Sequence, residues 1–93
     1  MAESVQVTPS GSVGKQVYAA TVPKVLESVF LDAPTSGATV TVRDGNASGD
    51  VRLQMTVPVA VGFNSAELDC VRFDRGMHVK VTGVGATAYL LIK

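Results

Sequence analysis

Oxygen-bearing side chains between residues 44 and 50 form the pattern in this chain that comes nearest to a chemical site. They occupy alternate positions: Asp44, Asn46, Ser48 and Asp50. Gly49 stands where the sharp turn of a calcium loop falls, but an EF-hand also requires a bidentate glutamate at its twelfth position and flanking helices. That position is Met55 here. We therefore expect a turn and no metal site, with these four residues as the one candidate loop.

Groups suited to catalysis are few and scattered. His78 is the sole histidine, and alternation with Met77 and Val79 predicts that it faces solvent. No serine lies in a nucleophile elbow, although a triad assembles in space and the sequence leaves that point open. Glu67 and Asp69 share a strand face, which we interpret as solvated. We expect no catalytic residue, no enzyme activity and no cofactor.

The segment from Ala38 to Val57 predicts a β-hairpin. Val40 and Val42 alternate with polar residues before the Gly/Asn/Asp-rich connector, and the same alternation resumes from Val51 to Val57. Period-two alternation places every second side chain on one sheet face, and the connector supplies residues that tolerate positive φ.

Further short strands are expected along the rest of the chain. They span residues 3–8, 15–21, 24–31, 67–73, 77–82 and 86–92, with an edge or irregular strand at 59–63 after Pro58 and a turn at 62–65. Alternation breaks between Cys70 and Val71, which predicts a bulge there. Seven to eight strands at spacings of about ten residues predict an all-β fold, an antiparallel β-sandwich or jelly roll.

Composition narrows the possible partners. The chain has 93 residues, with 17 valines and eight threonines, and its eight basic residues balance eight acidic ones. Enrichment in β-branched residues suits strands, and a neutral chain offers no broad attraction to nucleic acid or membrane lipid. Cys70 is the only cysteine and has apolar neighbours, so we expect a buried thiol. The first residues lack a secretion signal, which predicts folding in a cytoplasm.

Two parts are expected in the chain. Residues 1–14 contain a short strand-like segment followed by a Pro/Ser/Gly-rich stretch, and we interpret them as an N-terminal arm and linker. Residues 15–93 are expected to form the β-sandwich domain. Val5 and Val7 of the arm are candidate interface residues, because an extended segment can add a strand to a partner's sheet edge.

The last strand predicts contact with another subunit. Ala88, Leu90 and Ile92 occupy one face, while Tyr89 and Leu91 occupy the other. The strand at 24–31, with Phe30, has apolar residues on both faces in the same way. A two-layer sandwich normally leaves its outer face polar, so we expect Phe30, Tyr89 and Leu91 at a homo-oligomer interface. The alternative is burial of these strands within one chain.

Four segments of the chain carry a family resemblance. They are the Gly/Ser-rich N-terminal arm, the hairpin entry Thr-Val-Thr-Val-Arg-Asp-Gly at residues 39–45, the turn and strand at 73–79, and the closing Gly-Ala-Thr-Ala-Tyr-Leu-Leu-Ile at 85–92. Together they resemble small β-sandwich structural proteins of tailed bacteriophages. The resemblance implies a virion component: a capsid decoration (cement) protein, a head fibre or a small tail protein.

The hypothesis from the sequence is therefore a bacteriophage capsid decoration protein. As the resemblance implies, it would be made in the host bacterial cytoplasm, would form homo-oligomers, and would bind the major capsid protein or other virion proteins. A tail or head-fibre module is the alternative of the same class. The alternative of another class is a glycan- or receptor-binding β-sandwich that uses the loops at residues 44–50 and 62–65.

Overall fold

The chain folds into strands and turns, with no helix in its described parts. The computed structural model describes residues 3–8, 14–18, 23–33, 37–59, 61–83 and 85–92, except for the side chains of Glu3, Asp69 and Cys70. Within these ranges there are eight strands: β1 (Glu3–Val7), β2 (Lys15–Tyr18), β3 (Lys24–Ala33), β4 (Ala38–Asp44), β5 (Asp50–Val57), β6 (Gly62–Phe73), β7 (Met77–Thr82) and β8 (Thr87–Ile92).

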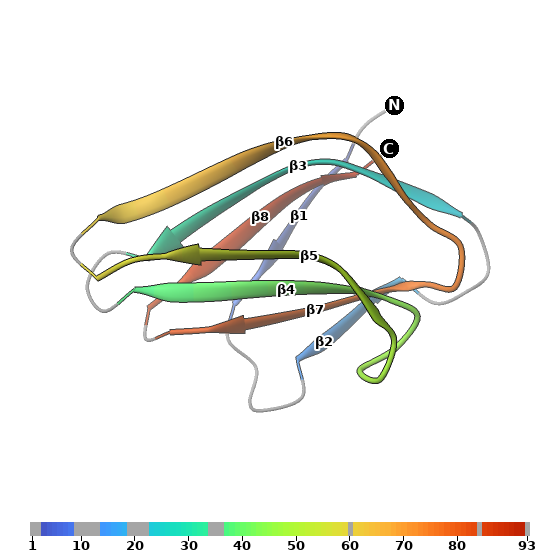
Figure 1. Ribbon diagram of the computed structural model, residues 1–93, viewed down its shortest axis with the longest axis horizontal. Coiled ribbons are helices and arrows are strands. Elements are labelled where there is room, and N and C mark those ends of the chain that lie inside the picture. Colours follow the sequence, from blue (N-terminus) through green and yellow to red (C-terminus); the bar gives the residue numbers. More distant parts are fainter. Residues whose placement is uncertain are drawn as a thin grey trace.

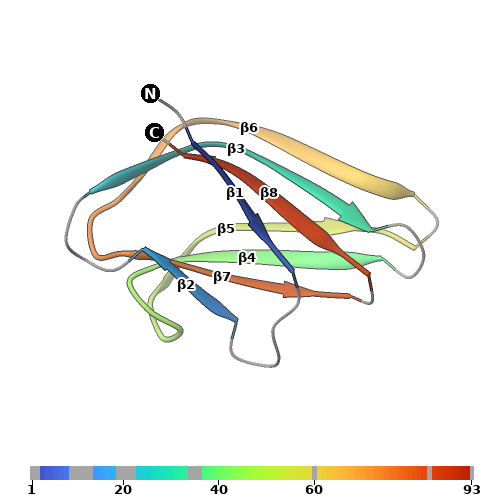
Figure 2. The same ribbon diagram turned by 180° about the vertical axis from the view of Figure 1, so that it is seen from behind.

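The strands form two antiparallel four-stranded sheets that pack face to face (Figures 1 and 2). Sheet A has the order β1-β8-β3-β6, and sheet B has the order β2-β7-β4-β5. Strand pairing is nested: β1 pairs with β8, β2 with β7, β3 with β6, and β4 with β5. Eight strands in two sheets with this order make a jelly roll. The predicted fold class is confirmed.

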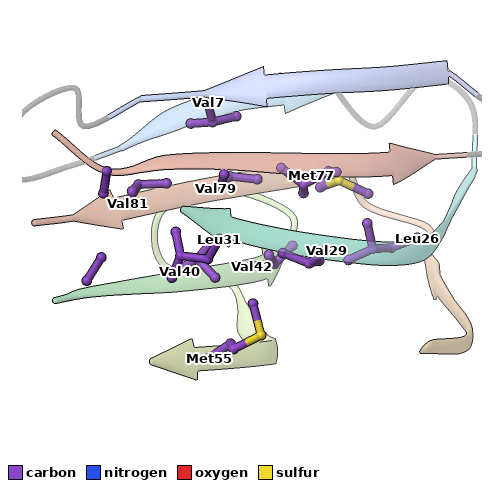
Figure 3. Close-up of a cluster of buried hydrophobic side chains, with 14 of the residues drawn as sticks. Val7, Leu26, Val29, Leu31, Val40, Val42, Met55, Met77, Val79 and Val81 are labelled. Carbon is purple, nitrogen blue, oxygen red and sulfur yellow. The ribbon is translucent and has the colours of Figure 1, made fainter. Parts of the chain in front are cut away.

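The core lies between the two sheets (Figure 3). Sheet A contributes Leu26, Val29 and Leu31 from β3, and sheet B contributes Val40 and Val42 from β4, all at most 1% exposed. Each of these side chains alternates with an outward-facing neighbour, except that two residues, not one, lie between Leu26 and Val29. β-branched valines suit this arrangement because their stiff side chains pack well on a pleated surface.

Two local predictions are confirmed by the strand register. The hairpin at 38–57 is β4 and β5, with Val42 opposite Leu53 and a register shift beyond that pair. The predicted bulge lies in β6, where Leu26 pairs with Val71 but Ser28 already pairs with Glu67. β6 therefore holds two more residues than β3 between these pairs. The side chain of Cys70 falls in this stretch and lies outside the described residues.

The N-terminal segment differs from the predicted arm. β1 pairs in full with β8 of the same chain, with Val7 opposite Ala88, and the Val7 side chain is 1% exposed. Residues 3–7 therefore belong to the sandwich as its edge strand, and they bury apolar surface that an isolated arm would expose. Of the expected linker, residues 9–13 lie outside the described residues.

The segment between β5 and β6 also differs from expectation. Val59 and Val61, the described residues before β6, lie in a turn and not in a strand, and the Val61 N–H donates to the Pro58 carbonyl at 3.2 Å. The turn expected at 62–65 is instead the straight beginning of β6. Phe63 and Ser65 thus alternate along a strand, which places them on the outer face of sheet A.

Turns from three parts of the chain meet at one end of the sandwich. Gly45, after β4, donates its N–H to the carbonyl of Gly76, before β7, at 2.9 Å. The Gln16 side-chain amide donates to the carbonyls of Tyr18 and Gly45 at 2.7 and 2.6 Å. Gly76 has φ +110°, and a Cβ there would lie 2.7 Å from the Tyr18 carbonyl oxygen. Only glycine fits this position without strain.

Gly76→Ala should destabilise the fold more than Gly62→Ala. Both glycines have positive φ, at +110° and +97°, but a Cβ at Gly62 meets nothing within 4 Å. Gly62→Ala therefore measures the backbone cost alone, about 1 to 2 kcal/mol. Gly76→Ala adds the clash with Tyr18, and we expect at least about twice that loss. Urea unfolding of both variants measures the difference, and equal losses would contradict the packing at Gly76.

Candidate functional site

An uncovered apolar patch lies on the outer face of sheet A. Phe30 on β3, Phe63 on β6, and Tyr89 and Leu91 on β8 are 37–57% exposed. The Phe30 and Phe63 rings are stacked, with centroids 5.6 Å apart and planes 17° apart. The Phe30 and Tyr89 centroids are 6.0 Å apart at 46°. We call Phe63, Phe30 and Tyr89 the aromatic ridge.

The strand register assembles this ridge from distant parts of the sequence. Phe30 lies directly opposite Tyr89 on β8 and opposite Ser65 on β6, two residues from Phe63. Val29 and Leu31 point into the core, so the alternation of β3 forces Phe30 outward between them. Cross-strand aromatic pairs at these separations attract one another, which orders the ridge in the free protein.

A shallow hollow of about 260 Å³ adjoins the aromatic ridge. Its lining includes small hydroxyl side chains from three strands: Ser4, Ser28 and Ser65. Phe30, Tyr89 and Leu91 form further parts of its wall, and Glu67 lies at its β6 side. We call this feature the serine hollow. Ridge and hollow lie next to each other on one sheet face.

The outer face of sheet B is polar by contrast. Thr39 and Thr56 lie opposite each other with hydroxyl oxygens 3.2 Å apart, and the Gln54 amide donates to the Thr41 hydroxyl at 3.4 Å. Lys80 lies opposite Thr41 on the other side. This face follows the usual pattern of an antiparallel sheet, with one side on the core and one in solvent. The two outer faces of the protein therefore have opposite character.

The structure brings three of the predicted interface residues together and separates two others. Phe30, Tyr89 and Leu91 share the exposed face of sheet A. Val7 is buried in the core, and Val5 is partly buried against it, so their placement in an exposed arm is wrong. Sheet pairing of β1 turns these valines inward. Phe63 was missed because Gly62–Ser65 has a turn-like composition, although Phe63, Ser65 and Glu67 alternate as a strand face does.

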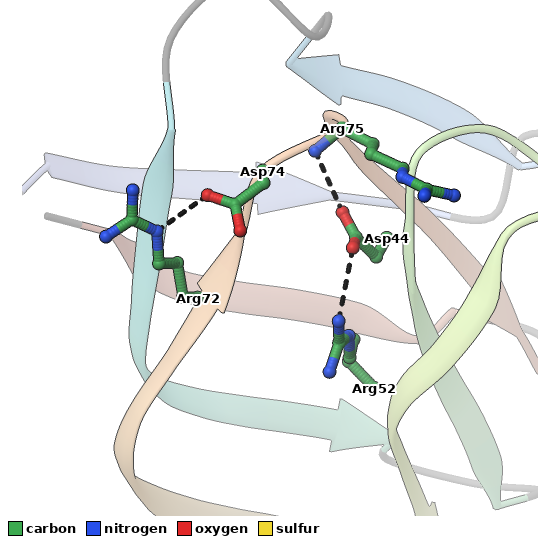
Figure 4. Close-up of polar contacts among 5 residues, drawn as sticks. All are labelled: Asp44, Arg52, Arg72, Asp74 and Arg75. Atoms are coloured by element: carbon green, nitrogen blue, oxygen red, sulfur yellow. Dashed lines mark hydrogen bonds and ion pairs between the residues drawn. The ribbon is translucent and has the colours of Figure 1, made fainter.

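Asp44, the first residue of the candidate metal loop, is bonded to two arginines outside the loop (Figure 4). The Asp44 carboxylate accepts from the Arg75 backbone N–H at 3.1 Å and pairs with the Arg52 guanidinium at 3.3 Å. Asn46 accepts from the Ser48 N–H at 2.9 Å, which is an Asx turn. An open cleft of about 480 Å³ includes Asp44, Asn46 and Ser48 in its lining, but Asp50 is not part of it.

Calcium addition should leave the melting temperature unchanged. The Arg52 guanidinium already neutralises Asp44, and a cation at that carboxylate would have to displace it. In the described residues no three His, Cys, Asp or Glu side chains lie close enough to hold a metal ion. Thermal unfolding with and without millimolar calcium measures the effect. A rise in melting temperature that Asp44→Asn removes would contradict this interpretation of the loop.

His78 is buried, which corrects the prediction that it faces solvent. Its position on β7 does point to the outer side of sheet B, between Gln16 on β2 and Arg43 on β4. The residue is only 4% exposed, because the backbone at Gly14 covers the ring: a Cβ on Gly14 would lie 2.8 Å from His78 Cε1. Nδ1 has no hydrogen-bond partner among the described residues. No serine among the described residues is hydrogen-bonded to the His78 ring either.

Burial lowers the pKa of His78 from its ordinary value of 6.5, and the nearby Arg43 guanidinium lowers it further. Both effects penalise the protonated ring in the folded state. Below pH 6.5 the unfolded chain therefore binds a proton that the folded chain resists. The contribution of neutral His78 to the free energy of unfolding is therefore fully present above pH 6.5. It is lost as the pH falls toward the lower pKa that His78 has in the folded state.

His78→Phe should flatten the pH dependence of stability between pH 7.5 and 5.5. The native protein is expected to lose stability across this window, and the variant should not, because the chain has no other histidine. Carboxylates titrate mostly below the window. Melting temperatures of both proteins at four or five pH values test the point. Parallel curves for the two proteins would show that His78 is not the group responsible.

The remaining acidic candidates form no site. Glu67 is exposed on the outer face of sheet A, and the Asp69 side chain lies outside the described residues. Arg72, which neighbours them on β6, pairs instead with Asp74 at 2.6 Å (Figure 4). That pair is solvent-exposed on both sides, so it contributes little to stability.

Comparison with known proteins identifies no relative. No family model matches the chain, and no curated protein or solved structure does. The described parts of the chain contain no helix of the length and hydropathy needed to cross a membrane. The surface of the molecule is therefore the basis for proposing a function.

Proposed function

We propose that this protein is a non-enzymatic structural component of a tailed-bacteriophage virion, specifically a capsid decoration protein that self-associates and binds the shell. The observation that carries the proposal is the uncovered aromatic face of sheet A. Exposed, contiguous apolar surface on a small domain favours association, because it removes that surface from water. The outer face of sheet B is polar, so it has no comparable apolar surface to remove from water.

The fold is compatible with the proposal, and the surface supports it more directly. Jelly rolls occur in viral capsid and lectin domains, and a rigid two-sheet unit suits a protein that is repeated over a lattice. Fold alone does not set function, so the surface carries more weight. The resemblance to small phage β-sandwich proteins supplies the virion setting, in which copies and shell proteins together cover the exposed surface.

The edge of β1 is the proposed contact with the shell. β1 is the outermost strand of sheet A, so one side of its backbone has no strand beside it in the described structure. Free N–H and C=O groups on an edge strand pair readily with an extended segment of another protein. The N-terminal segment thus keeps the binding role expected of it, as a strand of the domain and not as a detached arm.

The alternative of a glycan-binding module is less well supported. It relied on loops expected at residues 44–50 and 62–65, but the second segment is the beginning of β6, and the two segments lie at opposite ends of β5 (Figure 1). A strand of eight residues is about 26 Å long. The two segments therefore form no common site. The cleft beside Asn46 is polar but open, and the loop around it is already bonded internally.

Purified protein should co-sediment with capsids assembled from the shell protein of the same phage genome. Binding should saturate at a fixed number of copies per particle, because a decoration protein occupies equivalent lattice positions. Density at these positions in electron micrographs of the particles would identify them. Protein that stays in the supernatant with matched capsids would overturn the proposal, and capsids of an unrelated phage serve as the control.

A further inference from the structure

We infer that the outer face of sheet A docks against a second copy of this chain, with the aromatic ridge of each copy in the serine hollow of the other. The inference rests on the proposed function in assigning self-association to this face. It goes further in naming the occupant, the symmetry and the residues that meet. Its basis is the arrangement of side chains that the strand register places on the face.

Two neighbouring rows of outward side chains cross all four strands of sheet A. The first contains three large side chains and one serine: Gln6, Tyr89, Phe30 and Ser65, in the order β1-β8-β3-β6. The second has serines on β1 and β3 and larger side chains on β8 and β6: Ser4, Leu91, Ser28 and Glu67, in the same order. The rows are about 7 Å apart, since two residues separate them on each strand. The first row forms the ridge with Phe63, and the second lies in the hollow.

A two-fold axis in the interface plane, perpendicular to the strands and midway between the rows, exchanges the two rows. Each strand then faces its own equivalent, and Phe30 lies over Ser28 of the second copy. Tyr89 lies over Leu91 of the second copy, which pairs two apolar side chains. An isologous interface requires this kind of self-complementarity, because the same patch supplies both sides. Side chains of packed sheets interdigitate, and the contact of Phe30 with Ser28 places a large side chain over a small one.

Charge on this face is compatible with the same arrangement. Glu67 is the only charged residue in the two rows. Under the two-fold it faces Ser65 of the second copy, whose hydroxyl is a hydrogen-bond donor. The two glutamates therefore do not meet, and like-charge repulsion is avoided. Buried tyrosine hydroxyls need a polar partner, and the serines that line the hollow offer one to Tyr89.

The size of the face suits a reversible dimer. Four strands spaced about 4.8 Å apart and about six residues long present a face of roughly 19 by 20 Å. Two such faces together cover about 760 Å², which is below the size of stable specific interfaces and corresponds to a weak, reversible contact. Stacking this face on sheet B of another copy would instead place aromatic rings on threonine, glutamine and lysine. A second copy in the two-fold arrangement is therefore the better occupant.

The Ser28→Phe variant distinguishes this arrangement from non-specific apolar association. The variant exposes more apolar surface, so non-specific association would become stronger. In the two-fold dimer the added ring meets Phe30 of the other copy, and dimerisation should weaken at least about tenfold. Phe30→Ser should weaken it comparably by removing the ridge. Gln54→Phe, on the polar face of sheet B, is the matched control and should leave the dimer intact. Circular dichroism and thermal melting verify folding.

Mixing the two variants provides the decisive measurement. In a heterodimer of Ser28→Phe with Phe30→Ser, one of the two ridge contacts is native. In the other contact, the phenylalanine ring introduced at position 28 of one variant lies over the serine introduced at position 30 of the other. The two variants associate weakly alone, but they should dimerise when they are combined. Sedimentation velocity over a concentration series measures this.

Three outcomes would overturn the inference. They are a native protein that is monomeric, a Ser28→Phe variant that associates as tightly as the native protein, and a mixture of the two variants that stays monomeric. A monomer that still binds capsids would leave the capsid-binding part of the proposed function standing and would remove its self-association. A dimer that binds no capsid would remove that function alone.

Discussion

Burial of the two inner sheet faces against each other is the interaction on which the rest of this structure depends. Side chains alternate along each strand, so burying Val29 and Leu31 leaves Phe30 no position except the outer face. The same holds for Tyr89 between Ala88 and Leu90. The exposed ridge is thus a direct consequence of core packing. Moving it inward would require a shift of register that exposes the core.

The contrast between the two outer faces links this packing to function. Sheet B has threonine, glutamine and lysine on its outer side and is adapted to water. Sheet A exposes stacked aromatic rings beside a hollow lined by serines. Exposing aromatic rings to water costs free energy that polar side chains at the same positions would not. A monomer therefore gains nothing from such a face. The proposed association would remove the ridge from water.

The part of the structure that could be predicted from the sequence is the part governed by local alternation. The hairpin at 38–57, the bulge expected at Cys70 and Val71, and the outward position of Phe30, Tyr89 and Leu91 follow from a period of two. Four residues were misplaced for non-local reasons. β8 pairs with β1 and turns Val5 and Val7 inward, the backbone at Gly14 covers His78, and Phe63 lies in the long strand β6. Local composition contains no information on these neighbours.

The sequence by itself determined the all-β class, the positions of most strands and which side chains share a strand face, because these depend on residues two apart in the chain. Only the tertiary structure decided the nested strand order, the burial of His78, the closure of the loop at Asp44 and the joining of ridge and hollow. The physical reason is that each of these requires residues far apart in the chain to meet. Which strands become neighbours depends on how both sheets together bury the most apolar surface, and no single segment encodes that.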